Sequence, residues 1–341
     1  ILHHTELDHS ATFSAMTGGD IYLKCENRQK TGSFKIRGAS NKIAALMERG
    51  GLQAVVASSA GNHAQGVACA ARKFGIPATI VMPKAAPIAK VQATENYGAR
   101  VVLAGDCYDD AYKRACEICE EEGATFLHPY KINPRVKVYG VQAEGADAIA
   151  RSYKAKRLIS TDTASTIADG IAVKSPGDIT VDLINRYADG VVTVSDMEIS
   201  SAILLLMERC KQIVEPAGAT PLAAVLSGKL DVKGKRVVCV MSGGNIDVSF
   251  VQSIIEQGLV ARHRRIKFAV KLLDRPGSLE QLLHILASMS ANILTVQHDK
   301  LSQGLNPNET TVSVACEVAG EEHGKAVMDA LKAHGYTILM D

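Results

Sequence analysis

The sequence predicts an α/β protein with two parts, a two-lobed domain with parallel sheets and a smaller C-terminal βαββαβ domain. Three observations indicate this fold. Between residues 53 and 241, short apolar segments alternate with amphipathic segments, which is typical of parallel strands joined by helices. The chain has 341 residues, more than one ordinary domain contains. After residue 265 the pattern changes, and helical stripes are interleaved with strand-like segments of another order.

Each apolar segment of the first domain leads through a turn into a helical segment, so its elements can be placed in order. We expect strands at 21–25, 54–57, 79–82, 101–103, 125–127, 136–141, 191–194 and 236–241. We expect helices at 39–47, 62–74, 88–97, 108–122 and 197–209, and another that begins at residue 146. Continuous apolar strands of this kind are buried on both faces, with helices covering the sheet.

The C-terminal segment has a different order of elements. Strands are expected at 266–273, 293–298, 310–318 and 336–340, and helices at 279–289 and 322–334. A βαββαβ order of this size is typical of the split-βαβ, ferredoxin-like arrangement. We therefore expect a first domain at 1–256, with its smaller lobe at about 40–130, a basic linker at 257–265 and a second domain at 266–341.

Composition excludes several classes of partner. The 38 basic and 36 acidic residues leave a net charge of +2, which gives no reason to expect nucleic acid or an anionic membrane as a partner. No apolar run reaches the ~18 residues that a membrane span needs, and the first residues have no signal-peptide pattern. Most of the eight cysteines lie in apolar segments, and no second ligand pair follows Cys116 and Cys119, so no metal site is expected. A reducing compartment is expected, the cytoplasm or an organelle lumen.

The run Thr31–Gly38 places Lys35 between Phe34 and Ile36, where a turn meets a helical segment. Desolvation at such a junction disfavours the ammonium form of lysine. A neutral amine can form a Schiff base with an aldehyde cofactor. Taken alone, Lys35 has a simpler interpretation as a surface lysine, because buried lysines are rare.

Two further loops follow strands of the first domain. Ser58–His63 follows one strand and opens a helix, so backbone N–H groups there are suited to a carboxylate or a phosphate. Ser242–Asn245 follows the strand at 236–241 in the same manner. In open α/β sheets, ligands bind at the carboxyl ends of the strands. Each loop alone is also explained as a helix cap or an ordinary glycine turn.

These three stretches together resemble the pyridoxal-phosphate enzymes of the tryptophan-synthase-β-like fold (fold type II), and most closely the threonine dehydratases, or threonine ammonia-lyases. Residues 166–170 and 215–219 are also similar to that family, and the resemblance covers nearly all of residues 1–255. It implies pyridoxal 5′-phosphate as cofactor. It also implies β-elimination of water from L-threonine to give 2-oxobutanoate and ammonia, with L-serine giving pyruvate more slowly.

The resemblance assigns roles to residues of this sequence. Lys35 would carry the cofactor as a Schiff base and take the α-proton of the substrate. Phe34 would line the ring, Asn62 would hydrogen-bond its 3-hydroxyl, and Ser242 would face its nitrogen. The residues implied in cofactor binding are thus Lys35, Phe34, Asn62, Ser242 and Gly243. Those implied in holding the substrate carboxylate are Ser59, Ala60, Gly61, Asn62 and His63.

Position 60 separates two activities of this fold. Serine racemases are expected to carry a serine there as the proton donor on the second face, whereas this chain has Ala60. We therefore favour a dehydratase over a racemase. A serine dehydratase or a residual racemase stays open as an alternative, as does a catalytically defunct protein that senses amino acids.

One expected feature is absent from the sequence. The resemblance implies a glycine-rich loop that binds the cofactor phosphate after residues 126–130, and no such loop follows. The strand ending near Tyr130 is joined almost at once to the next strand, although parallel neighbours need a crossover of about a dozen residues or more. We hypothesise that a segment of a few dozen residues, present in the physical protein, is missing between Tyr130 and Lys131.

The C-terminal domain resembles ACT domains, which bind amino acids at the interfaces of paired modules. The resemblance implies an effector site made of Asp274, Gly277, Ser278, Leu279 and Asn292. A purely connecting turn in an assembly module is the alternative. Pairing implies a homodimer or homotetramer, and the sequence leaves the effector and the sign of its effect open.

Overall fold

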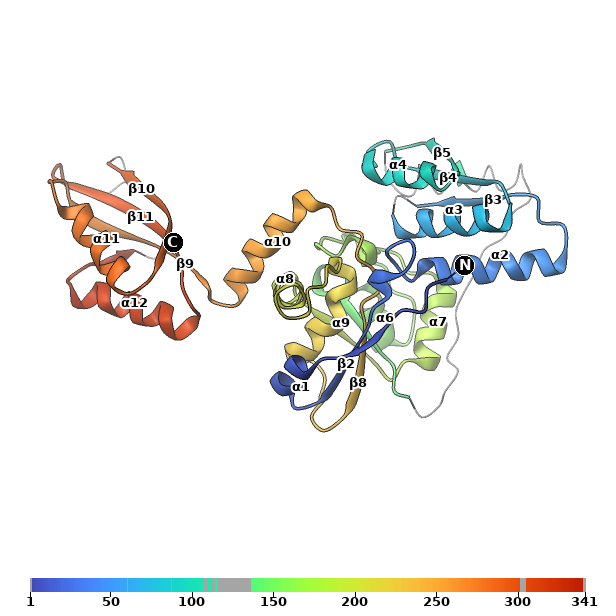
Figure 1. Ribbon diagram of the computed structural model, residues 1–341, viewed down its shortest axis with the longest axis horizontal. Coiled ribbons are helices and arrows are strands. Elements are labelled where there is room, and N and C mark those ends of the chain that lie inside the picture. Colours follow the sequence, from blue (N-terminus) through green and yellow to red (C-terminus); the bar gives the residue numbers. More distant parts are fainter. Residues whose placement is uncertain are drawn as a thin grey trace. The chain divides into compact units, whose positions relative to one another are not determined.

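The structure is a computed structural model that describes residues 2–59, 61–86, 88–106, 110–111, 114–115, 136–300 and 305–339. The chain divides into two compact units, Ile1–Val251 and Gln252–Asp341. The boundary lies within helix α10 (Val248–Ala261) (Figure 1). Each unit is described separately.

The first unit contains parallel strands followed by helices, as the apolar periodicity predicts. Its strands are β1 (Leu7–His9), β2 (Asp20–Lys24), β3 (Val55–Ser58), β4 (Ala78–Met82), β5 (Arg100–Leu103), β6 (Tyr139–Ala143), β7 (Gly190–Val194) and β8 (Arg236–Val240). Its helices are α1 (Ala11–Thr17), α2 (Lys35–Arg49), α3 (Asn62–Phe74), α4 (Ile88–Asn96), α6 (Ala148–Ala155), α7 (Asp178–Tyr187), α8 (Asp196–Leu205) and α9 (Pro216–Leu226). Short 3₁₀ helices are η1 (Glu26–Arg28), η2 (Glu144–Ala146) and η3 (Asp169–Ile171), and η4 (Leu206–Cys210) is a π-helix.

The smaller lobe is built on the parallel sheet β3-β4-β5. Its central strand β4 is buried at every residue, as expected for a strand covered on both faces. Helix α3 packs its alanine-rich side against this sheet, and α2 lies along α3 (Figure 1). The parallel arrangement is the one predicted from the continuous apolar strands.

The larger lobe contains two sheets, β1-β2-β8 and β6-β7. The β2–β8 and β6–β7 pairs are parallel, and β1 is antiparallel to β2. Helix α9 contacts β6, β7 and β8 and so packs against both sheets. Among the described strands only β2 pairs with β8. On β8, Val238 and Val240 are 50% and 42% exposed, which is unusual for valines in a sheet of this kind.

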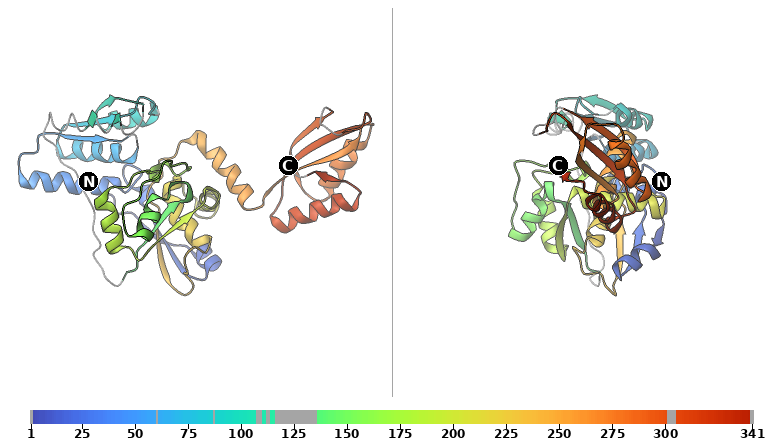
Figure 2. Two further views of the ribbon diagram at one scale, coloured as in Figure 1. Left: turned by 180° about the vertical axis from the view of Figure 1, so that it is seen from behind. Right: turned by 90° about the vertical axis from the view of Figure 1, so that its left-hand side faces the viewer.

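The second unit has the predicted βαββαβ order. Its elements are β9 (Arg265–Leu273), α11 (Ser278–Ser288), β10 (Asn292–Asp299), β11 (Glu309–Glu317), α12 (Glu321–Ala333) and β12 (Ile338–Leu339). The strands form one antiparallel-paired sheet in the order β10-β11-β9-β12. Both helices cover one face of it (Figure 2), and their apolar side chains, such as Leu286 of α11, share a core with those of the sheet, such as Phe268 of β9.

Several boundaries differ from the prediction. The expected linker at 257–265 is wrong in its first part, because the apolar face of α10 continues through Leu259 and the helix ends at Ala261. The elements β1, α1, α7, α9 and α10 were not predicted. The expected helix at 108–122 lies mostly outside the described residues, and the strand at 125–127 wholly outside. No helix in the described ranges combines the length and the apolar character needed to cross a bilayer.

Candidate active site

Lys35 is the first residue of α2, and helix α3 packs against this start of α2. A Cβ atom on Gly66 of α3 would lie 3.0 Å from the Ile36 nitrogen and 3.1 Å from the Lys35 carbonyl carbon, so a side chain here would require the start of α2 to shift. Ile36 is fully buried. Burial lowers the pKa of Lys35 below its ordinary value, and the negative charge of Glu215 opposes this shift only in part. The structure therefore gives Lys35 the environment of a reactive amine rather than of a surface lysine.

The turn before Lys35 is bonded to the loop after β8. The Phe34 N–H donates to the Ser242 carbonyl at 3.0 Å, and the Gly244 N–H donates to the Gly32 carbonyl at 2.8 Å. Between these bonds, Ser33 and Gly243 form an isolated β-bridge. Backbone hydrogen bonds thus join the lysine turn to the Ser242–Asn245 loop, although the two lie about 210 residues apart in the chain.

Asn62, the first residue of α3, is hydrogen-bonded to the Ser242–Asn245 loop. Its Nδ2 donates to both carboxylate oxygens of Glu215, at 2.8 and 2.9 Å. Its Oδ1 accepts a hydrogen bond of 2.7 Å from Asn245 Nδ2, which also donates to the Thr31 carbonyl at 2.8 Å. Three loops predicted separately from the sequence are therefore joined by side-chain amides.

The helix start that carries Asn62 also carries His63. Burial and the positive charge of Lys35 lower the pKa of His63 to about 4, so the ring is neutral at pH 7. Gly61 occupies the N-cap position of α3, and this terminus has no hydrogen bond from a capping side chain. The first N–H groups of α3 therefore lack a capping side chain, an arrangement that suits an anion.

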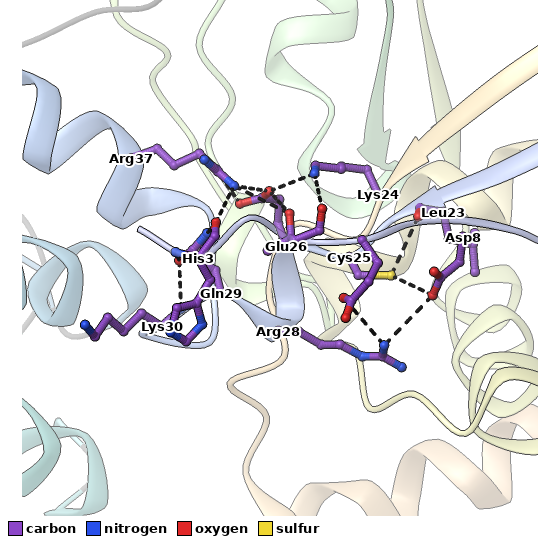
Figure 3. A network of polar contacts seen from close by, with 12 residues as sticks. His3, Asp8, Leu23, Lys24, Cys25, Glu26, Arg28, Gln29, Lys30 and Arg37 are labelled. Atoms are coloured by element: carbon purple, nitrogen blue, oxygen red, sulfur yellow. Dashed lines mark hydrogen bonds and ion pairs between the residues drawn. The ribbon is translucent and has the colours of Figure 1, made fainter. Parts of the chain in front are cut away.

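Arg37, two residues after Lys35, links α2 to η1 (Figure 3). Its Nε and Nη2 donate to Glu26 at 2.7 and 2.8 Å, and the Thr5 hydroxyl donates to the same carboxylate at 2.6 Å. Glu26 is only 4% exposed. Burial alone would favour its neutral form, but the hydrogen bonds from Arg37 and Thr5 outweigh it and hold the pKa of Glu26 below its usual range. Arg37 thus has a structural role in orienting the helix of Lys35.

The polar groups of this region suit an aldehyde on a hydroxylated nitrogen heterocycle. Lys35 supplies an amine and Asn62 an amide, and within the described residues the buried hydroxyls of Ser33 and Ser58 have no hydrogen-bond partner. Unpaired buried hydroxyls are costly unless a ligand satisfies them. A Cβ atom on Gly243 would lie 2.3 Å from Glu215 Oε1 and 3.0 Å from Asn62 Nδ2, so a side chain here would collide with the Asn62–Glu215 pair. The donor set fits pyridoxal phosphate at its aldehyde and ring.

The predicted residues of the first unit can now be placed. The structure brings together Lys35, Phe34, Gly61, Asn62, His63, Ser242 and Gly243 on the loops described above. Ser59 lies at the end of β3, where its Oγ accepts from the Gly61 N–H at 3.2 Å. Ala60, Cys116 and Cys119 lie outside the described residues, as does the junction between Tyr130 and Lys131.

The sequence alone assigned no role to Glu215 or Asn245, although both lie in stretches that are similar to the family, residues 215–219 and 242–245. Glu215 occupies the N-cap position of α9 and is buried. Burial raises its pKa, and the Asn62 hydrogen bond opposes this. The signal in the sequence was an acidic residue before Pro216 in an otherwise apolar helix, since a lone buried carboxylate needs a partner.

The residues predicted for an effector do not form one site within a single chain. Asp274, Gly277, Ser278 and Leu279 belong to the turn from β9 to α11, where Asp274 pairs with Lys300 at 2.6 Å. Asn292 pairs in register with Glu317, which lies opposite Arg265 at the other end of the sheet. Within one chain Asn292 and the turn therefore lie at opposite ends of the sheet, and the effector site expected at an interface of paired modules stays a prediction. The crossover through α11 returns the chain to the end where β9 began, as it must between parallel strands.

A lysine of lowered pKa, set at the start of a helix among three loops at strand ends in a two-lobed parallel α/β domain, defines the class of pyridoxal-phosphate enzymes of fold type II. The family model described as "Pyridoxal-phosphate dependent enzyme" matches this chain over residues 2–135 and 130–243. The chain belongs to that family.

Relatives and solved structures agree with this assignment. The chain is 43% identical to the L-threonine ammonia-lyase of Thermotoga maritima over 382 aligned positions, covering 99% of this chain and 95% of the relative. The processed form of threonine deaminase isoform 2 from Solanum lycopersicum matches with a TM-score of 0.70 and 28% identity, over 75% of this chain and 84% of that chain. Maize serine racemase matches with a TM-score of 0.67 and 31% identity, over 77% and 94%.

Proposed function

We propose that this protein is a threonine ammonia-lyase. It removes the β-hydroxyl of L-threonine as water, and the enamine that results tautomerises and is hydrolysed to 2-oxobutanoate and ammonia. L-Serine would give pyruvate in the same way. The observation that carries the proposal is Lys35, whose pKa is lowered by burial where three loops meet.

The names of the relatives support the substrate. The similar proteins of Thermotoga maritima and Geobacter sulfurreducens are L-threonine ammonia-lyases, at 43% and 39% identity over 99% of this chain. The catabolic L-threonine dehydratase of Staphylococcus aureus is 41% identical over 72% of this chain. A solved threonine deaminase shares the fold.

The residues of this chain divide the work between binding and proton transfer. Pyridoxal phosphate, when bound, holds amino groups as Schiff bases and withdraws electrons from the bond to the α-hydrogen. Lys35 holds the cofactor and, once released, its neutral amine accepts the α-proton of the substrate. Its lowered pKa keeps the free-base form accessible near neutral pH.

Other groups position the two molecules. The uncapped start of α3, at Gly61 and Asn62, binds the substrate carboxylate through backbone N–H groups. We expect the Asn62 amide to hydrogen-bond the ring hydroxyl and Ser242 to face the ring nitrogen. A neutral hydroxyl at that nitrogen does not force its protonation, which favours rapid elimination over a long-lived carbanion. His63, being neutral, adds no charge that would repel a protonated substrate amine.

Racemisation is the competing activity, since maize serine racemase shares the fold at 31% identity. Ala60 has no proton to donate to the second face of the substrate. We therefore expect D-serine to form from L-serine at a small fraction of the rate of pyruvate formation, and comparable rates would favour the racemase.

The test of the proposed function is a coupled assay for 2-oxobutanoate with purified protein and L-threonine. We expect activity in the wild-type chain and none in Lys35→Ala. Borohydride treatment should bleach a yellow protein and fix the cofactor mass on Lys35. Oxoacid production by Lys35→Ala would overturn the role of the lysine. A colourless protein that binds amino acids without turnover would favour a sensor instead.

We further propose that a segment is missing from the printed sequence near residues 130–135. The family model matches in two stretches that meet at 130–135. The alignment with the Thermotoga maritima enzyme has 382 positions against 341 residues, so at least 41 positions of the relative (382 less 341) have no counterpart here. One edge of β8, with exposed Val238 and Val240, pairs with no strand of the described residues, which supports a further strand in the larger lobe. The missing segment would carry the glycine-rich loop for the cofactor phosphate.

Peptide mass spectrometry of the protein from its natural source decides this point. Cleavage after glutamate releases the peptide Gly123–Glu144, which spans the whole window, only if nothing is inserted there. Detection of that peptide, or an intact mass near 36.3 kDa, would contradict the proposal. A protein that truly lacks the segment should retain the cofactor poorly.

For the second unit, we propose an ACT-type module that binds an amino-acid effector in a homodimer or homotetramer. Its βαββαβ order and the turn at Gly277, with a φ of +86°, support this. The 2-oxobutanoate assay with isoleucine, valine, leucine or serine added tests it, and an unchanged rate with all four would count against regulation by these amino acids. The described cysteines are free, which supports a reducing location, the cytoplasm or an organelle lumen.

A further inference from the structure

Within the described residues, the buried carboxylate of Glu215 accepts hydrogen bonds from one side chain. It is 8% exposed, and both of its oxygens accept from Asn62 Nδ2 at 2.8 and 2.9 Å. Although it is the N-cap residue of α9, its side chain makes no capping bond to that helix. Its backbone N–H donates to the Gly243 carbonyl at 2.9 Å. The side chain therefore acts on the site and not on the helix that carries it.

The contact with Glu215 decides which way the Asn62 amide points. A flipped Asn62 would turn its Oδ1 toward the carboxylate and its NH₂ toward the NH₂ of Asn245, and both contacts would be repulsive. The orientation of Asn245 is set in turn, because its Nδ2 donates to the Thr31 carbonyl at 2.8 Å. A single chain of oriented hydrogen bonds thus runs from Glu215 to the turn that precedes Lys35.

Burial raises the pKa of Glu215, and side chains on four elements also affect it. Asn62 of α3 donates a hydrogen bond to Glu215, which lowers its pKa. Lys35 of α2 and Lys90 of α4 also lower it, and the negative charge of Asp169 of η3 raises it. Burial lowers the pKa of Lys35, whereas the negative charge of Glu215 favours the ammonium form of Lys35. His63, neutral near pH 7, is itself affected by Lys35.

We propose that Glu215 is a positioning residue of the lyase site, which fixes the orientation of the Asn62 amide and supplies the counter-charge to the Lys35 ammonium. This inference rests on the proposed function, because it gives Asn62 and Lys35 their roles toward the cofactor. The two actions are separable. The orientation requires an acceptor at position 215, and the counter-charge requires a negative one.

The first test measures the Lys35 amine directly in the cofactor-free protein. Competitive labelling with acetic anhydride across pH, read by mass spectrometry of the Lys35 peptide, gives the midpoint of its titration. Glu215→Gln should lower that midpoint by about half a pH unit or more, since the charge that favours the ammonium is lost. Glu95→Gln, on α4, is the control and should leave it unchanged. An unchanged or raised midpoint in Glu215→Gln would overturn the counter-charge role.

The second test measures orientation through the affinity for pyridoxal phosphate in an absorbance titration. Glutamine keeps an acceptor for Asn62, so Glu215→Gln should bind within about threefold of wild type, whereas Glu215→Ala should bind about tenfold more weakly. Equal affinities in all three proteins would refute the positioning role. Urea midpoints of the apo proteins report folding, and Glu215→Gln carries the test if Glu215→Ala is unstable.

These outcomes are distinct from failure of the proposed function. The labelling experiment needs no turnover and no cofactor. If Lys35→Ala is inactive while Lys35 labelling ignores position 215, only the inference about Glu215 fails. If Lys35→Ala remains active, the proposed function fails whatever the labelling shows.

Discussion

Gly66 lies against the peptide that joins Lys35 to Ile36, at a distance where a methyl group would meet backbone atoms 3.0 and 3.1 Å away. Backbone cannot swing aside as a long side chain can. The position of Lys35 is therefore set partly by the absence of a side chain on a neighbouring helix.

This contact predicts opposite results for two glycine-to-alanine changes. Gly38→Ala, where nothing lies within 4 Å, should stabilise α2 by about 1 kcal/mol through helix propensity. Gly66→Ala has the same intrinsic gain but must displace the start of α2, so we expect a loss of stability and a fall in activity of about tenfold or more. Urea unfolding and the 2-oxobutanoate assay check both. A Gly66→Ala protein as stable and active as Gly38→Ala would contradict the packing argument.

His63 predicts a pH dependence of stability. Its folded pKa of about 4 lies below the ordinary 6.5, so between these values the unfolded chain binds a proton that the folded chain does not. Stability is then complete above pH 6.5 and is lost as the pH falls toward 4. From pH 7 to pH 5 the His63 contribution should fall by about 2 kcal/mol.

Urea unfolding of the apo protein at pH 7 and pH 5 measures this loss. His63→Gln, which cannot titrate, should lose less than wild type over the same interval, by about the His63 contribution. The same loss in both proteins would show that His63 is protonated in the folded state.

The Arg37–Glu26 pair predicts an asymmetry between two arginines. Arg37→Met leaves the carboxylate of Glu26 buried without its charged partner and should lower the free energy of unfolding by about 2 kcal/mol. Arg28→Met removes only longer, exposed contacts of 3.6 and 3.9 Å to Glu6 and Asp8, and should cost about 0.5 kcal/mol or less. Adding Glu26→Gln to Arg37→Met should recover part of the loss. Equal losses for the two arginines would show that the burial of Glu26 does not matter.

Local chemistry made some elements predictable and left others hidden. Helix α3 was predicted at 62–74 and found there, because Gly61 precedes it and Gly75, with a φ of +71°, ends it. Helix α9 was not predicted, since its run of apolar residues lacks the one-sided pattern of a surface helix. A helix buried on all sides looks like any other apolar run.

The site shows the same division. Lys35, Asn62 and Ser242 could be singled out because each follows a turn at the end or start of an element. The bond between Asn62 and Glu215 joins residues 153 positions apart, and no local pattern contains that pairing. The separation of Asn292 from the Asp274–Leu279 turn was missed, although the crossover through α11 already implied it.

That separation has a consequence for how the enzyme would respond to dilution. A ligand that touches both the turn after β9 and Asn292 must bridge two molecules, because the length of the sheet divides these residues within one. Its half-saturating concentration would then depend on the concentration of the protein itself, through the law of mass action. A ligand held by the turn alone would show a constant midpoint at every protein concentration.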